Sequence, residues 1–328
     1  MRKYIIKRIL ISIVILFFVA FIIYALMRCL PTSYIENMAR QKSMQPGSKS
    51  FDERMEQLTA MYNMDKGIFY GFFAWLGQML RGEFGDSWFY TVPVIQKFHS
   101  SIWVSFVMGL VAMILELIIA IPLGVIAATK QYSRTDYTIS VLALAGISLP
   151  TFFFASLLKL VFSVKLQWFD LFGLTGRNYE QLSAMGQFLD KAHHLVLPIV
   201  TLVVISVGSL MRYTRTNMLE VLNADYIRTA RAKGLDERKV IYHHAFRNTL
   251  IPLVTIVGGS LPGLFSGALI TETLYSIPGI GYVSYQAMVG GDIPFSMFYL
   301  TFLAILTLAG NLIADILYAV VDPRVRIS

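Results

Sequence analysis

Residues 224–240 read ADYIRTARAKGLDERKV, and eight of these seventeen side chains are charged. Across all 328 residues only 15% are charged, whereas 56% are hydrophobic. Long apolar segments lie on both sides of the strip. A polar stretch of this kind within an apolar chain predicts a water-exposed loop between segments that lie in lipid.

Six apolar segments have the length of membrane-spanning helices or come close to it. A span needs about 20 mainly apolar residues, because the hydrocarbon layer is about 30 Å thick and a helix rises about 1.5 Å per residue. The predicted spans are residues 9–27, 101–129, 137–158, 195–211, 249–271 and 293–321. The chain is therefore predicted to be an all-α membrane protein with six transmembrane helices.

The distribution of Lys and Arg predicts the orientation of these spans. With a cytoplasmic N-terminus, sixteen of the 28 Lys and Arg residues fall in inner segments, while the outer loop 272–292 has none. An excess of this kind is typical of cytoplasmic loops. Both termini are therefore expected to be cytoplasmic, and the net charge of +8 reflects topology and contact with anionic membrane lipid, not nucleic-acid binding.

The chain divides into three parts on this topology. Residues 1–29 hold the cytoplasmic N-terminus and the first span, which is expected to stay as an anchor because its apolar core is long for a signal peptide and no small-residue cleavage site follows. Residues 30–100 form an extracytoplasmic insert, where apolar residues at helical spacing from Phe51 to Tyr62 predict a small helical cap. Residues 101–328 form a five-helix core. Cys29 is the one cysteine, which excludes an intrachain disulfide.

Residues 212–248 form the one long cytoplasmic loop of this topology. Asn223 or Asp225 is expected to cap a short helix that Gly234 ends, and Asp236 to cap a second helix. The first helix is expected to present an apolar tip with a basic rim, a make-up that fits a groove on another protein. This plug is formed by Tyr226, Ile227, Arg228, Ala230, Arg231 and Lys233. Composition alone equally allows a basic segment that lies on anionic lipid.

The order of residues around the strip resembles the cytoplasmic loop of ABC importer permeases. DYIRTARAKGLDERKVIYHHAFRNTLIP (225–252) is similar to the EAA motif in the B-type subunit of oligopeptide, dipeptide and nickel permeases. Gly234 takes the place of the fixed glycine of the motif, and Pro252 follows it at the distance found in the peptide-permease version. The Glu-Ala-Ala itself falls on Arg228, Thr229 and Ala230, of which only Ala230 matches.

Other stretches extend the resemblance over nearly the whole chain. The outer segment and C-terminus of the family are similar to YNMDKGIFYGFFAWLGQMLRGEFGDSWFYTVPV (62–94) and NLIADILYAVVDPRVR (311–326), and its membrane segments to AIPLGVIAA (120–128), ISLPTFF (147–153) and ETLYSIPGIG (272–281). Three positions on the outer side depart from the family pattern. Gly67 and Asp170 stand where proline is usual, and GGDIP (290–294) lacks the usual arginine and tyrosine.

The resemblance implies a type I ABC importer permease fold and a division of labour among several chains in a bacterial-type cell membrane. An extracytoplasmic binding protein delivers a peptide, two related permease subunits form the pathway, and two ATPase subunits hold ATP and Mg²⁺. This chain has no G-x-x-x-x-G-K-[ST] sequence, the loop that binds the phosphates of ATP. We therefore expect that it is not an enzyme and that it binds no cofactor. The residues expected to couple it to an ATPase are Tyr226, Arg228, Ala230, Arg231, Lys233 and Gly234. Whether the substrate is a short peptide, a longer one or nickel stays open, because specificity depends on the binding protein.

Several competing sites are weighed against this interpretation. Glu116, Glu272 and Asp315 are ionisable residues in or beside spans and are therefore possible pathway or gate residues, although each also has a structural interpretation. Ser156 and Lys159 fit a Ser-x-x-Lys hydrolase motif, which a short apolar match easily produces by chance.

Two further alternatives concern metals and energy. His193-His194 and His243-His244 are expected to hold no metal, because neighbouring residues point to different helix faces and no carboxylate cluster accompanies them in the sequence. The runner-up function is a secondary transporter or channel, which needs no ATPase partner.

Overall fold

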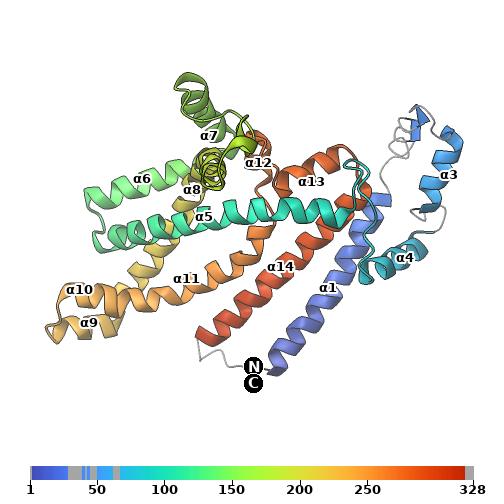
Figure 1. Ribbon diagram of the computed structural model, residues 1–328. Coiled ribbons are helices and arrows are strands. Elements are labelled where there is room, and N and C mark those ends of the chain that lie inside the picture. The colour runs from blue at the N-terminus through green and yellow to red at the C-terminus, as the bar shows by residue number, and fades with distance from the viewer. Residues whose placement is uncertain (1, 29–38, 41–42, 45–49, 62–66, 322–328) are drawn as a thin grey trace. The chain divides into compact units, whose positions relative to one another are not determined.

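The computed structural model describes residues 2–28, 39–40, 43–44, 50–61 and 67–321, and within these ranges the regular elements are all helical (Figure 1). The elements are α1 (Arg2–Arg28), α3 (Phe51–Met61), α4 (Ile68–Leu80), α5 (Val94–Thr129), α6 (Arg134–Ser148), α7 (Thr151–Leu158), η1 (Lys159–Lys165), η2 (Tyr179–Gln181), α8 (Ala184–Leu222), α9 (Asp225–Ala232), α10 (Glu237–Lys239), η3 (Val240–Phe246), α11 (Arg247–Ser260), η4 (Leu261–Phe265), α12 (Leu269–Tyr275), α13 (Ile280–Val289) and α14 (Ile293–Val321). Segments η1 and η3 are π-helical, and η2 and η4 are 3₁₀ turns.

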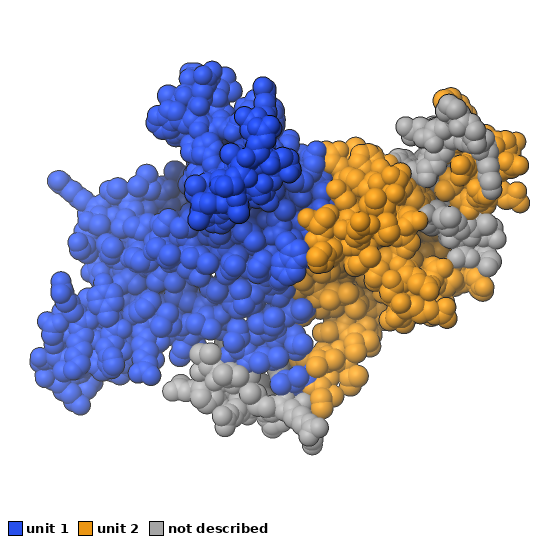
Figure 2. Space-filling view, viewed as in Figure 1, with its two compact units in different colours: residues 1–5, 101–283, 309–328 blue, residues 6–100, 284–308 orange. Residues whose placement is uncertain are grey.

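The chain forms two compact units (Figure 2). Unit 1 comprises residues 1–5, 101–283 and 309–328, and unit 2 comprises residues 6–100 and 284–308. These units are defined by contacts between residues and not by the side of the membrane on which the residues lie. The assignment of parts 1–29, 30–100 and 101–328 to the two sides of the membrane stays a prediction.

Among the described residues, five helices are long and apolar enough to cross a membrane, or six if one bent pair counts as a span. The first, second and last predicted spans are confirmed by α1, α5 and α14. The fourth is longer than predicted, because the apolar part of α8 is only the middle of a 39-residue helix with polar ends.

Two predicted spans have the wrong shape. Residues 137–158 were expected to form one helix, but the chain bends by 100° between α6 and α7. Leu149 is extended there because the ring of Pro150 disfavours the helical conformation in the residue before it. Residues 249–271 were also expected to be one span, yet the helical segment runs from Glu237 to Phe265 and ends before Gly267, whose φ of +78° a regular helix does not allow.

In unit 1, α6 packs closely against α8. A Cβ added at Gly146 of α6 would lie 2.8 Å from the carbonyl oxygen of Val204, so the absent side chain lets the two backbones approach. At the other end of α6, Asp136 is 3% exposed and accepts two hydrogen bonds from Arg215 of α8, Nε–Oδ1 and Nη2–Oδ2 both at 2.8 Å. This pair, in which the aspartate is buried and the arginine partly exposed, holds the beginning of α6 to α8.

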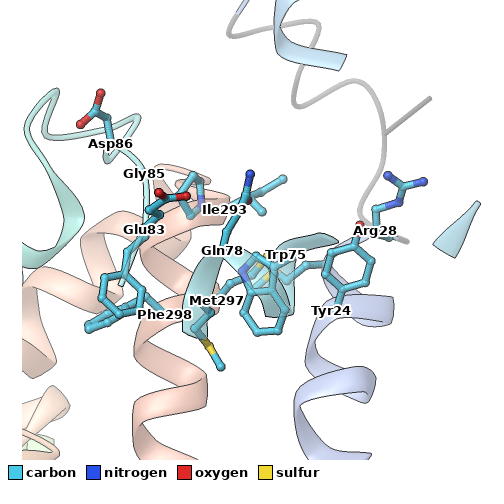
Figure 3. Close-up of a pocket in the computed structure, with 14 residues that line it drawn as sticks. Tyr24, Arg28, Trp75, Gln78, Glu83, Gly85, Asp86, Ile293, Met297 and Phe298 are labelled. Atoms are coloured by element: carbon cyan, nitrogen blue, oxygen red, sulfur yellow. The ribbon is translucent and has the colours of Figure 1, made fainter. Parts of the chain in front are cut away.

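In unit 2, aromatic side chains join α1 to α4. Phe72 is fully buried, and its ring meets those of Phe17, Phe21 and Tyr24 edge-on at 5.2–5.8 Å between centroids. Beside this cluster is a cavity of about 310 Å³, with Trp75 among its apolar lining and charged groups at its edge (Figure 3).

Candidate functional site

The charged strip forms two helices that meet at a glycine, as predicted. Gly234 follows α9 with φ of +73°, a left-handed conformation that ends a helix. Asp236 caps α10, and its carboxylate accepts a hydrogen bond from the backbone N–H of Arg238 at 3.1 Å. Both signals lie within a few residues of the turn that they form, which is why the sequence reveals them.

The predicted cap at the beginning of α9 is wrong. Ala224 takes the N-cap position, and no side chain caps the helix there. Asn223 instead ends α8, where its amide donates to the Leu219 carbonyl at 2.9 Å. Asp225 is the first residue of α9 and favours that end of the helix through its negative charge.

The apolar residues of α9 face the protein interior. Ile227 and Ala230 are 0% and 6% exposed, since a spacing of three residues puts both on one helix face. That face packs in a cluster with residues of α5, α8 and η3, namely Val125, Ala128, Met218, Val240 and Ala245. The prediction that Ile227 and Ala230 form an exposed apolar tip is therefore wrong.

The opposite face of α9 and the turn after it are exposed and mostly basic. Tyr226 is 48% exposed, and Arg228, Arg231 and Lys233 are also exposed. Partial burial raises the pKa of Tyr226, which a hydrogen bond with the Asn248 side chain opposes. Hydrogen bonds to the Glu237 carboxylate raise the pKa of Arg231. The surface therefore presents permanent positive charge around one tyrosine ring, backed by a packed apolar layer.

Glu116 lies on α5 within a cavity of unit 1. The cavity has a volume of about 260 Å³, and its lining includes Ser206 of α8 and Gly263 of η4. The Glu116 side chain hydrogen-bonds Ser206. The same two helices, α5 and α8, contribute both to the lining of this cavity and to the apolar core that packs against α9.

Glu272 and Asp315 have different surroundings. Glu272 is fully buried, and its carboxylate accepts hydrogen bonds from the Ser105 hydroxyl, the Ala268 N–H and the Tyr282 N–H at 2.7–2.9 Å. It holds the turn between α12 and α13 against α5. Asp315 is partly buried on α14. The sequence does not distinguish these three acids, because no neighbouring residue in the chain signals the burial of each one.

Ser156 and Lys159 do not form the catalytic pair that a Ser-x-x-Lys hydrolase would need. The Ser156 hydroxyl donates to the Phe152 carbonyl at 2.7 Å, and Lys159 Nζ donates to the Leu274 carbonyl at 2.6 Å. Each group is thus engaged by backbone and not by the other.

Two groupings were missed in the sequence. The Asp136–Arg215 pair joins residues 79 positions apart, and no local pattern signals it. The expectation that no carboxylate accompanies His193-His194 is wrong, because Oδ2 of Asp170 lies 3.2 Å from Nε2 of His194.

Residues 120–327 match the model of the family described as binding-protein-dependent transport system inner membrane component. This range holds the 223–240 loop, which we define as the segment with α9, the Gly234 turn and α10. It also holds the cavity residues of α8 and η4 and all of α14. The chain belongs to this family.

Several peptide permease proteins are similar to this chain over nearly its full length. The oligopeptide transport system permease protein AppB of Bacillus subtilis (strain 168) is 37% identical, with 99% of this chain and 100% of that one covered. The dipeptide transport system permease protein DppB of Escherichia coli (strain K12) is 34% identical, with 92% of each covered. The oligopeptide transport system permease protein OppB of Salmonella typhimurium is 33% identical, with 99% and 100% covered.

A solved structure of the MetNI methionine ABC transporter in an inward-facing conformation aligns with 69% of this chain and 98% of its own, at 18% identity and a TM-score of 0.49. Family membership and the apolar helices make this chain a multi-pass membrane component of a transport system.

Proposed function

We propose that this chain is the pathway subunit of an ATP-driven peptide importer, with both termini and the 223–240 loop in the cytoplasm. One observation carries the proposal: the exposed basic face of α9 is backed by a core that it shares with α5 and α8. A surface docked on another protein can move those two helices only if it is packed against them. The curated relatives named as oligopeptide and dipeptide permeases support peptides as the substrate class.

The energy is proposed to come from separate chains. The sequence has no phosphate-binding loop of the G-x-x-x-x-G-K-[ST] type, so ATP and Mg²⁺ are assigned to two ATPase subunits and not to this chain. In this proposal a cleft of one ATPase subunit receives Tyr226, Arg228, Arg231, Lys233 and the Gly234 turn. Ala230 lies on the buried face of α9 and contributes to coupling by packing this helix against α5 and α8.

Transport is proposed to follow from two packings of the helices. Closure of the ATPase pair displaces α9, and the shared core passes the displacement to α5 and α8, which bias the path between inward- and outward-open states. Glu116 is the pathway residue of this scheme. Glu272 holds the turn between α12 and α13, and a role for Asp315 at a gate stays a prediction. A second, related permease subunit completes the wall, and an extracytoplasmic binding protein delivers the peptide.

The test is purification with the native companions, followed by reconstitution in lipid vesicles. We expect a related permease and two ATPase chains to co-purify, and peptide uptake to need ATP and the binding protein together. Proton-driven uptake by vesicles that contain this chain alone would instead identify a secondary transporter. A matched pair of variants separates loss of docking from general loss of charge: Arg228→Ala on the exposed face of α9, and Arg177→Ala between η1 and η2, a segment that the predicted topology places outside.

A further inference from the structure

We propose that Asp170, His193 and His194 form a binding site for a divalent transition-metal ion such as Zn²⁺. One ligand atom of each residue lies within 4.8 Å of the other two. Asp170 belongs to the loop between η1 and η2, and both histidines lie on α8. The three residues all belong to unit 1.

Backbone carbonyls fix the protonation of both imidazole rings. Nε2 of His193 lies 3.0 Å from the Trp168 carbonyl oxygen, and Nδ1 of His194 lies 2.8 Å from the Asp190 carbonyl oxygen. A carbonyl only accepts hydrogen bonds, so these two nitrogens carry the protons. The other nitrogen of each neutral ring then has a free lone pair, as is usual for metal-binding histidines whose second nitrogen donates to a backbone carbonyl.

The free nitrogen of His194 is buried without a hydrogen-bond partner. The side chain of His194 is 2% exposed, and its Nε2 has no hydrogen bond among the described residues. Oδ2 of Asp170 lies 3.2 Å away, but a carboxylate cannot donate to it. In the neutral ring, a lone pair that faces a carboxylate is repelled unless a metal ion lies between them; a proton on the same nitrogen is the competing way to satisfy this contact. Two ligands of a tetrahedral Zn²⁺, each about 2.0–2.1 Å from the ion, lie about 3.3 Å apart, close to the spacing seen here.

A second carboxylate supports the arrangement. Oδ1 of Asp190 lies 3.8 Å from Nδ1 of His194, and Oδ2 of Asp190 accepts from the Gly176 N–H at 2.8 Å. Asp190 therefore orients His194 through its backbone carbonyl, and its carboxylate adds negative charge beside the ring. The ion can enter from water, because the Asp170 side chain is 58% exposed and His193 is exposed as well.

The ligand set selects the class of metal. Two imidazoles and one carboxylate suit Zn²⁺, Co²⁺ or Ni²⁺, whereas Mg²⁺ and Ca²⁺ prefer oxygen ligands alone. Three protein ligands leave a fourth position for water or for an incoming group. Such an ion would also clip the loop that carries Asp170 onto α8.

The test uses Co²⁺ as a spectroscopic probe on the full chain, purified in detergent with the subunits that accompany it. We expect one Co²⁺ per chain with the intense visible bands of a tetrahedral ion, and displacement of it by Zn²⁺. Asp170→Asn and His193→Gln change exposed residues and are not expected to disturb folding. Each should weaken binding by about 100-fold or more, because changing an outer-shell partner alone costs about 10–100-fold. Asp190→Asn should fall in that smaller range.

The other histidine pair provides the matched control. His243 and His244 are also adjacent, with ring centroids 5.2 Å apart, but in the described ranges no third ligand group gathers with them. Their double change to Gln should leave Co²⁺ binding unaltered. Absence of tetrahedral Co²⁺, or binding that survives Asp170→Asn, would overturn the proposal. Neither result depends on transport, so failure here is separate from failure of the proposed function.

Discussion

Arg231 and Glu237 form a two-point ion pair on either side of the Gly234 turn, with Nη2–Oε1 at 2.7 Å and Nε–Oε2 at 3.2 Å. The two side chains are 43% and 56% exposed, so water screens their attraction. Exposed pairs of this kind stabilise a fold by at most about 1 kcal/mol. The pair therefore contributes little to stability and instead fixes how α9 and α10 meet.

Exchanging the two charges separates the pair from the positive surface. The double variant Arg231→Glu with Glu237→Arg keeps an ion pair but moves the positive charge from α9 to α10. We expect unchanged thermal unfolding and about tenfold weaker binding of the ATPase subunits, the effect of losing one modest interfacial charge pair. Affinity measured at two salt concentrations checks this. Normal binding by the exchanged variant would mean that geometry, not the sign of the charge, matters.

The Gly234 turn gives a second prediction. Gly234→Val should lower peptide uptake per ATP hydrolysed while the chain still inserts, because a β-branched residue at positive φ costs about 1–3 kcal/mol and shifts the turn. A Cβ there meets no neighbour, so backbone strain is the cause and not a clash. Uptake and ATP hydrolysis in vesicles measure the ratio.

Two controls accompany Gly234→Val. Gly234→Asn should couple almost normally, because asparagine tolerates the left-handed region. Gly82 has φ of +79° and equally open space, so Gly82→Val applies the same strain within unit 2. Equal loss of coupling from both valine variants would count against a special role for the 223–240 loop.

Substitutions of Glu272 and Glu116 should affect different properties: the first mainly stability, the second mainly peptide uptake. Glu272→Ala removes the acceptor of three buried hydrogen bonds, and each donor left alone costs about 1–3 kcal/mol, so the unfolding temperature should fall sharply. Glu116→Gln can keep a hydrogen bond to Ser206 and should change uptake more than stability. Thermal unfolding and uptake of each variant would show a reversed order if these assignments are wrong.

The Asp136–Arg215 pair predicts a selective loss of stability. Arg215→Ala should destabilise the chain by about 1–3 kcal/mol, less than breaking a fully buried ion pair, because Arg215 is partly exposed and Asp136 keeps hydrogen bonds from the Tyr132 N–H and the Ser140 hydroxyl. Arg212→Ala, at an exposed arginine one turn earlier on the same helix, should change stability little, because both arginine hydrogen bonds to Asp136 come from Arg215. Similar unfolding curves for both would mean that the pair does not anchor α6.

Labelling of single cysteines tests the orientation. Cys29→Ser gives a cysteine-free background, into which Lys233→Cys and Gln181→Cys each place one exposed thiol. A membrane-impermeant reagent added to intact cells should label position 181 only. Labelling at 233 before the membrane is opened would refute the cytoplasmic placement of the loop.

The sequence by itself determined the features that depend on neighbours along the chain. Apolar length identified the spans, because the thickness of lipid sets it directly. Gly234 and Asp236 were found because a left-handed turn and a helix cap each involve only a few consecutive residues. The bend at Pro150 had the same kind of signal, but a continuous apolar run concealed it.

The tertiary structure decided which side each residue faces and which distant groups meet. Ala230 turned inward because α5, α8 and η3 cover its face, which the composition of α9 alone could not show. Glu272 and Asp170 acquired their partners from segments far away in the chain. Burial and pairing of this kind depend on how helices pack, and many packings are compatible with one pattern of apolar and charged residues.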